Sequence, residues 1–232
     1  MLNLRGLNQY YGESHTLWDL ALEVPRGSCT CLIGRNGVGK TTTLKCIMGL
    51  LPLQDGEIRL DGTLLSTQPA ESRARLGIGY VPQGREIFPR LTVDENLRLA
   101  LAVNRGEGGR RAYQRVLDTF PVLRQMLRRR GGDLSGGQQQ QLAIGRALIV
   151  EPTFLILDEP TEGIQPNIVH EIGDTIVRLN REVGMTVLLV EQKLPLARRV
   201  ADRFYVLDKG RAVASGAMSE LDDALVRRYL TV

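Results

Sequence analysis

Eight residues near the start of the chain have the types and spacing of a loop that binds phosphate. The run Gly34-Arg35-Asn36-Gly37-Val38-Gly39-Lys40-Thr41 fits G-x-x-x-x-G-K-[ST], and Thr42 follows it. Glycines let the backbone turn so that successive N–H groups point at phosphate oxygens. The lysine of this motif reaches the β- and γ-phosphates, and the hydroxyl of Thr41 is offered to Mg²⁺. The motif therefore predicts a site for a nucleoside triphosphate.

The segments on either side of this loop support that interpretation. An apolar strand is expected at Thr30–Ile33, and a helix is expected from Thr41 to Met48, closed by Gly49. A helix that begins behind the loop directs its positive end at the phosphates. A chance glycine-rich turn is the alternative, and the order strand, motif, helix argues against it.

An acidic pair follows a second apolar strand. Phe154–Leu157 leads directly into Asp158 and Glu159. Asp158 can hold Mg²⁺ through its waters, and Glu159 can orient or deprotonate an attacking water. The alternative is a simple surface turn.

Two further positions could contact the same ligand. Pro82 should end a strand that begins near Gly77, which leaves Gln83 at the strand's carboxyl end, where open parallel sheets bind ligands. The run Leu134-Ser135-Gly136-Gly137-Gln138 opens a helix that extends to about Val150, with Ser135 as N-cap. The N-terminus of this helix is therefore a second place in the chain, after the phosphate loop, where backbone N–H groups can bind an anion.

The composition bounds the class of protein. The 232 residues carry a net charge of +4, are 43% hydrophobic, and fit one α/β domain. The longest apolar run falls short of the ~18 residues that a membrane span needs, and the N-terminus lacks the layout of a signal peptide. Any membrane role is therefore expected to come through a partner. Cys29, Cys31 and Cys46 are expected to be buried thiols in a reducing cytoplasm.

The remaining elements are expected from local patterns. The segment 2–24 reads as β structure, and Tyr11 in its turn is either a base-stacking ring or an ordinary edge aromatic. Thr92 and Glu95 have the spacing of a capping box. A small antiparallel layer with a strand at 57–60 and a flexible loop at 105–111 are also expected. The basic run at 128–130 is either solvated or binds a partner. Further helices are expected at 113–126, 166–183 and 219–230, and further strands at 185–190, 204–207 and 211–214.

Together these motifs resemble the ATP-binding cassette (ABC) ATPases over essentially the whole chain. The resemblance implies one ABC ATPase domain, residues 1–232, of the α/β class. It has a phosphate-loop, RecA-like core at about 1–83 and 151–232, an antiparallel β layer, and a helical subdomain at about 84–150. It also implies ATP and Mg²⁺ as ligands, adenine stacking by Tyr11, and contact of Gln83 with the metal and the attacking water.

The resemblance also implies partners. In this family two cassettes pair head to tail, and each ATP lies between one phosphate loop and the partner's segment equivalent to residues 134–138. An importer adds two transmembrane permease subunits and an external or periplasmic solute-binding protein. The cassette itself is then a peripheral protein on the cytoplasmic face of the inner membrane. We expect no nucleic-acid partner.

Two positions depart from the family pattern. Gln165 stands where an Asp is usual, and Gln192 stands where a His is usual. Glutamine can donate a hydrogen bond to phosphate but carries no proton or charge at neutral pH. We therefore expect slow hydrolysis in the site formed by this Lys40, with Gln192 still among the catalytic residues.

These departures resemble the second ATPase of branched-chain amino-acid-type importers. Within that group the chain looks most like the ATPase of urea importers, and branched-chain amino acids or a related amide are the alternative solutes. The runs that carry this resemblance are 84–90, 136–141, 162–166 and 228–232. A soluble nucleic-acid-associated cassette, a small-molecule kinase and an exporter are the competing interpretations of the whole chain.

Overall fold

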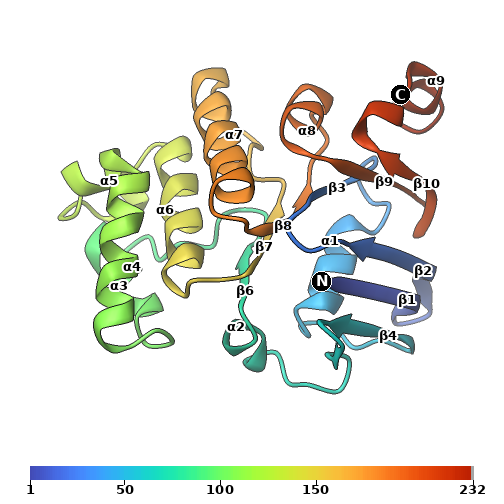
Figure 1. Ribbon diagram of the computed structural model, residues 1–232, viewed down its shortest axis with the longest axis horizontal. Coiled ribbons are helices and arrows are strands. Elements are labelled where there is room, and N and C mark those ends of the chain that lie inside the picture. The colour runs from blue at the N-terminus through green and yellow to red at the C-terminus, as the bar shows by residue number, and fades with distance from the viewer. Residues whose placement is uncertain (231–232) are drawn as a thin grey trace.

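The computed structural model describes residues 1–230, so Thr231 and Val232, the end of the run 228–232, lie outside the described residues. The chain forms two β-sheets with helices packed on them (Figure 1). The smaller sheet is antiparallel, in the order β2 (Ser14–Val24), β1 (Leu2–Tyr11), β4 (Asp55–Leu60), β5 (Thr63–Leu64). The larger has the order β10 (Arg211–Ala217), β9 (Arg203–Asp208), β3 (Cys29–Ile33), β8 (Thr186–Val190), β7 (Phe154–Asp158), β6 (Ile78–Val81).

The strands β9, β3, β8, β7 and β6 run parallel, and this arrangement positions the site. Every residue of β3, β7 and β8 is buried, as continuous apolar runs predict for a sheet covered on both faces. The residues that follow β3, β6, β7 and β8 therefore meet at one edge of the sheet. The phosphate loop, Gln83, the acidic pair and Gln192 are among them.

Helices separate the two sheets and cover the far face of the larger one (Figure 1). Helix α1 carries Leu44 and Ile47 into the core that it shares with the antiparallel sheet. A second core joins the opposite face of the larger sheet to α7 and to the helical subdomain, α3–α6. The helices are α1 (Lys40–Ile47), α2 (Ser72–Arg75), α3 (Val93–Ala100), α4 (Gly106–Thr119), α5 (Pro121–Gln125), α6 (Gly136–Ile149), α7 (Pro166–Arg181), α8 (Leu194–Val200) and α9 (Asp223–Tyr229).

Local signals at helix starts are confirmed. Thr92 caps α3 and Ser135 caps α6, each with a reciprocal capping box completed by Glu95 or Gln138. The antiparallel layer and the three buried thiols are confirmed as well. The two helix caps depend on contacts within three residues, which is why the local sequence predicted Thr92 and Ser135 as N-caps.

The prediction of a loop at 105–111 is wrong, because α4 begins at Gly106 and continues to Thr119. Gly109 is buried against the backbone carbonyl of Asn104, where a side chain would not fit. Ala112 and Val116 are buried on the same helix and belong to or border the core of the subdomain. This packing outweighs the low helix propensity of the glycines.

The end of the chain also differs from expectation. The predicted helix at 219–230 is a 3₁₀ turn, Met218–Glu220, followed by the seven-residue α9. Leu221, the first of the two residues between them, is buried and ends the turn. Helix α8 was not predicted. Within residues 1–230 no helix is long and apolar enough to cross a membrane.

Candidate functional site

A cavity of about 410 Å³ lies at the carboxyl edge of the larger sheet. The phosphate loop forms its floor, and the side chains of Tyr11, Gln83 and Glu159 reach it from three other segments. Thr16 also lines it, a position for which the sequence carried no signal. Three distant segments thus converge on the loop that the sequence singled out first: the β1–β2 hairpin, the end of β6 and the end of β7.

Lys40 is buried at the centre of this cavity, with 5% of its surface exposed. Its Nζ donates to the carbonyl oxygens of Gly34 and Arg35, both at 2.9 Å, and lies 3.3 Å from Glu159 Oε1. A buried ammonium needs such partners, because an unpaired charge out of water is costly. Glu159 therefore supplies the negative charge that a phosphate would supply when a nucleotide binds.

Gln192 joins the two sides of the site. Its Nε2 donates to Asn36 Oδ1 at 2.5 Å and to Glu159 Oε1 at 2.7 Å. Glu159 has a positive φ of 47°, so the backbone turns sharply there and directs its carboxylate back toward the loop. The structure thus brings Glu159 and Gln192 together with the phosphate loop.

Glu191 is a supporting residue to which sequence reasoning gave no role. Its buried carboxylate accepts hydrogen bonds from the Thr161 hydroxyl, at 2.7 Å, and from the backbone N–H groups of Gln192 and Lys193. It therefore fixes the turn that presents Gln192. The available signal was an acidic residue directly after the continuous apolar strand β8, where an ionised side chain needs a structural reason.

Asp158 fits a cation site. Both of its carboxylate oxygens are buried and lack a hydrogen-bond partner within residues 1–230. Burial raises its pKa to about 6, and the nearby Thr41 hydroxyl opposes this rise without forming a hydrogen bond of regular geometry. The part of the chain described here holds no group of three His, Cys, Asp or Glu that could bind a metal ion. Mg²⁺ at this place would take Thr41, Asp158, phosphate and water as ligands.

The buried carboxylate predicts a stabilising substitution. Because folding raises the pKa of Asp158, the native state binds the proton more tightly, and wild-type stability increases as the pH falls from above 6 toward 4. We expect Asp158→Asn to raise the free energy of unfolding of the nucleotide-free chain by about 1–3 kcal/mol at pH 8. Urea unfolding from pH 4 to pH 8 measures it, and the gain should shrink toward pH 4.

The exposed carboxylate of Asp133 gives a matched control for this prediction. Asp133→Asn should give no comparable gain in the free energy of unfolding at pH 8. A gain for Asp158→Asn that is equal at pH 4 and pH 8 would contradict a buried, ionised Asp158.

Gln83 connects the cavity to the helical subdomain. Its Nε2 donates to Glu162 Oε2 at 2.9 Å. Two residues later, the Arg85 guanidinium donates to Gln139 Oε1 on α6 at 3.0 Å, and Arg146 on the same helix donates to the Glu86 carbonyl at 2.7 Å. The loop after Gln83 is therefore fastened to the helix that begins at Ser135.

The rest of this loop is held by one buried amide. Asn96 Oδ1 accepts from the Phe88 N–H, and Asn96 Nδ2 donates to the carbonyls of Phe88, Leu91 and Thr92. All four contacts lie between 2.9 and 3.2 Å. Segment 85–92 is thereby bound to α3 as well as to α6. It forms one unit with the helical subdomain.

Residues 134–138 lie apart from the cavity, and none of them lines it. Ser135 is exposed as the N-cap of α6, while Gly137 packs so closely on α7 that a Cβ would approach Ile168 Cγ2 to 2.6 Å. The glycine is thus explained by packing, and the exposed helix start has free N–H groups for an anion. An anion bound there would lie outside this chain's own nucleotide cavity.

Tyr11 lies at the rim of the cavity with 47% of its surface exposed. Its neighbour Tyr10 is already engaged, because it stacks on His15 at 4.0 Å between ring centroids, and His15 stacks on Trp18 at 3.6 Å. Of these aromatic rings, the one that lines the cavity is therefore Tyr11.

Comparisons with known proteins identify this arrangement. The ABC transporter family model matches residues 17–162. The chain is 42% identical over 213 residues to the high-affinity branched-chain amino acid transport ATP-binding protein BraG of Pseudomonas aeruginosa, covering 92% of this chain and 91% of BraG. It is 38% identical over 221 residues to the branched-chain amino acid transport ATP-binding protein LivF of Archaeoglobus fulgidus, covering 95% and 94%.

Its fold is similar to the dimeric ATP-binding cassette MJ0796 bound to ADP and phosphate, with a TM-score of 0.85 at 27% identity over 94% of this chain and 99% of that one. The fold prediction is thus confirmed, including the antiparallel layer and the helical subdomain. The chain belongs to the ABC transporter family and is one of its ATP-hydrolysing cassettes.

Proposed function

We propose that this chain is an ATPase subunit of an ABC importer that takes up a small solute, with urea as the solute. The observation that carries the ATPase role is the ion pair of Lys40 with Glu159 inside one cavity, with the Gln192 side chain within hydrogen-bond distance of Glu159. Glu159 lies where it can act on a water next to a bound γ-phosphate.

Each residue of the site has a distinct role in this proposal. Tyr11 stacks on the adenine, the N–H groups of Gly34–Thr42 bind the phosphates, and Lys40 leaves Glu159 for the β- and γ-oxygens. Thr41, Asp158 and Gln83 hold Mg²⁺, which neutralises phosphate charge when bound. Glu159 then takes the proton of the attacking water, and Gln192 holds Glu159 in place.

A second, different cassette completes the site. The cavity is open and lacks residues 134–138 of its own chain, so a partner's equivalent segment fits over the phosphates. In return, Leu134, Ser135, Gly136, Gly137 and Gln138 of this chain would contact ATP bound to the partner. ATP then bridges a head-to-tail dimer, and hydrolysis weakens it by removing the bridging charge.

A groove between the core and the helical subdomain is suited to a permease. It has a volume of about 470 Å³ and is lined by apolar side chains such as Leu50, Tyr80 and Leu99, with Arg85 and Arg146 beside them. A short cytoplasmic helix of a transmembrane subunit would lay its apolar face there. The chain would then be peripheral, on the cytoplasmic face of the inner membrane, with two permease subunits and an external solute-binding protein.

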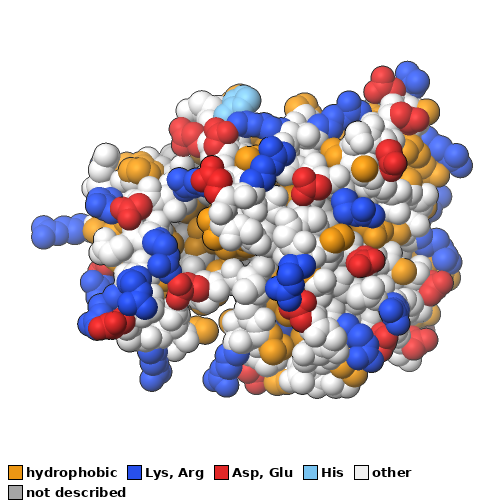
Figure 2. All heavy atoms as spheres, viewed as in Figure 1, with side chains coloured by type: hydrophobic (Ala, Val, Ile, Leu, Met, Phe, Trp, Pro, Cys, Tyr) orange, Lys and Arg blue, Asp and Glu red, His pale blue; other side chains and the backbone are white. Residues whose placement is uncertain are grey.

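The surface charge favours this role over nucleic-acid binding. Figure 2 shows basic and acidic side chains interspersed over the viewed face. A cassette that binds nucleic acid would gather its basic residues in a patch or stripe.

The solute is the least constrained part of the proposal. The runs 84–90, 136–141 and 162–166 favour urea, whereas the names of BraG and LivF favour branched-chain amino acids as the alternative. Co-purification of the tagged chain from native membranes tests both. We expect a different cassette, two membrane proteins and a solute-binding protein whose titration with urea and leucine identifies the solute. Recovery with ribosomes or nucleic acid alone would overturn the importer assignment.

The glutamine at position 192 predicts a gain of function. A histidine can carry a proton and a charge next to the γ-phosphate, which the neutral Gln192 amide cannot. We expect Gln192→His to raise phosphate release by the assembled complex severalfold. Gln54→His makes the same change at an exposed turn and should have no effect. An unchanged rate in both variants would argue against Gln192 as the cause of slow hydrolysis.

A further inference from the structure

A second cavity, of about 510 Å³, lies at the opposite edge of the larger sheet, near the starts of β7 and β8. In Figure 2 the molecule is hollowed between the helical subdomain and α7, and hydrophobic side chains are visible in the hollow. Its volume falls in the range of small-molecule sites, roughly 300–1,000 Å³. None of its lining residues belongs to the nucleotide cavity.

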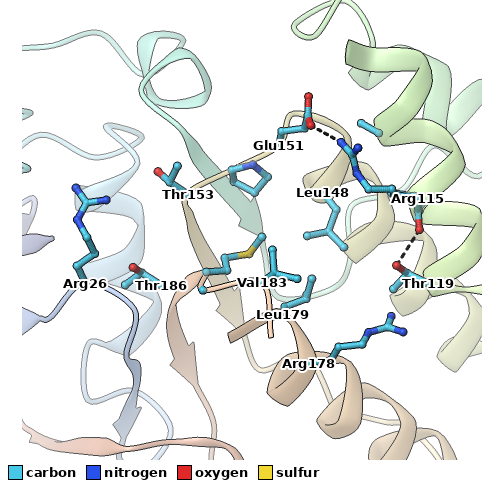
Figure 3. Close-up of a pocket in the computed structure, with 15 residues that line it drawn as sticks. Arg26, Arg115, Thr119, Leu148, Glu151, Thr153, Arg178, Leu179, Val183 and Thr186 are labelled. Carbon is cyan, nitrogen blue, oxygen red and sulfur yellow. Dashed lines mark hydrogen bonds and ion pairs between the residues drawn. The ribbon is translucent and has the colours of Figure 1, made fainter. Parts of the chain in front are cut away.

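The wall of this cavity is mainly apolar and comes from both parts of the chain. Val116 from α4 and Leu148 from α6 line it together with Leu179, Val183 and Met185, which belong to the end of α7 and the turn after it. Figure 3 shows Leu148 across the cavity from Leu179 and Val183. Val183 is 66% exposed, a high fraction for an apolar side chain beside a cavity. An apolar ligand here would contact the helical subdomain and the core at the same time.

Three arginines line the cavity, and they differ in their partners. Arg26 is paired with Asp61 at 2.7 Å, and Arg115 is paired with Glu151 (Figure 3). The half-buried Arg178 forms no side-chain hydrogen bond or ion pair with any other residue in the range 1–230. A guanidinium that lies partly out of water beside apolar side chains is well placed to bind an anion.

We propose that this cavity binds a small apolar carboxylate, with its carboxylate on Arg178 and its aliphatic part against Leu148, Leu179 and Met185. The positive charge of the cavity wall determines which head group the ligand carries. The one acidic side chain in the wall, Glu151, is already neutralised by Arg115, so the cavity carries an unbalanced positive charge. A guanidinium binds a carboxylate through two parallel, charge-assisted hydrogen bonds, whereas a neutral hydroxyl accepts a single weaker one and a cationic head group is repelled.

Titration of the purified, nucleotide-free chain with octanoate tests the proposal, and octan-1-ol and octylamine serve as probes with the same chain but other head groups. We expect saturable binding of octanoate at least about tenfold tighter than that of octan-1-ol, and no binding of octylamine. Arg178→Gln should reduce the affinity for octanoate to that for octan-1-ol. Val183→Glu should do the same, because it places a carboxylate one turn from Arg178.

Arg181→Gln is the matched control, since Arg181 lies in the same last turn of α7 but outside the cavity wall. It should leave octanoate binding unchanged. Equal affinity for octanoate and octan-1-ol, an unchanged affinity in Arg178→Gln, or an equal loss in Arg181→Gln would each overturn the proposal. ATP binding by the same samples is measured in parallel, so a failure here is distinct from a failure of the ATPase assignment.

Discussion

Replacing Glu159 by Gln is expected to lower ATP hydrolysis by the assembled complex at least 100-fold while ATP still binds. The amide has the same shape but cannot accept the proton of the attacking water, and general-base catalysis typically contributes 10²–10⁴-fold. ATP should bind at least as tightly as to the wild type, because Lys40 loses the carboxylate that lies 3.3 Å away in the nucleotide-free site. Phosphate release and calorimetric titration with ATP measure the two effects.

Glu162→Gln is the control for this substitution. Glu162 is three residues away and bonds the Gln83 side chain rather than Lys40. Its loss should reduce hydrolysis far less than the loss of Glu159. If Glu159→Gln retains a third or more of the wild-type rate, Glu159 is not the base and the catalytic assignment fails.

Replacing Lys40 by Met is expected to weaken ATP binding about 100-fold and to abolish hydrolysis. The methionine keeps the length and apolar stem of lysine, but it removes the charge that would bind the β- and γ-phosphates. It also leaves Glu159 facing the phosphates without a cation, which adds repulsion to the lost attraction. Titration of the isolated chain with ATP measures the change, and circular dichroism checks that the fold is retained.

Lys45→Met gives the matched comparison on the same helix. Lys45 lies in the last turn of α1 and does not line the nucleotide cavity. Its substitution should leave the affinity for ATP within about threefold of the wild type. Equal losses in the two variants would mean that net charge, rather than the position of Lys40, controls binding.

Short-range patterns predicted the elements that carry the site. Strand β3, the phosphate loop and α1 follow from the order of apolar residues, glycines and a lysine; the capping box at Thr92 follows from a three-residue spacing, and Ser135 was expected as an N-cap. The parallel sheet follows from apolar strands separated by helices. The strand, loop, helix and cap signals are each complete within about twenty residues, whereas the sheet is read from the order of many such elements along the chain.

Long-range contacts account for what the sequence did not reveal. Gln192 meets Asn36 across 156 positions, and Glu191 meets Thr161 across 30. The helix at 106–119 depends on burial against other helices, which its glycines and arginines do not signal. The free guanidinium of Arg178 is likewise visible only once the folded chain shows which acidic residues are already paired.

The fastening of segment 85–92 has a mechanical consequence. Because Arg85, Glu86 and Phe88 are all tied to α3 or α6, we expect this segment to move together with the helical subdomain. The short stretch between β6 and Arg85 links the segment to the sheet, and Gly84 within it has a φ of +80°, a left-handed conformation that favours glycine. Gln83 lies in this stretch, so we expect a displacement of its side chain at the γ-phosphate to be transmitted to the helical subdomain, and a movement of the subdomain to be transmitted back to the phosphate.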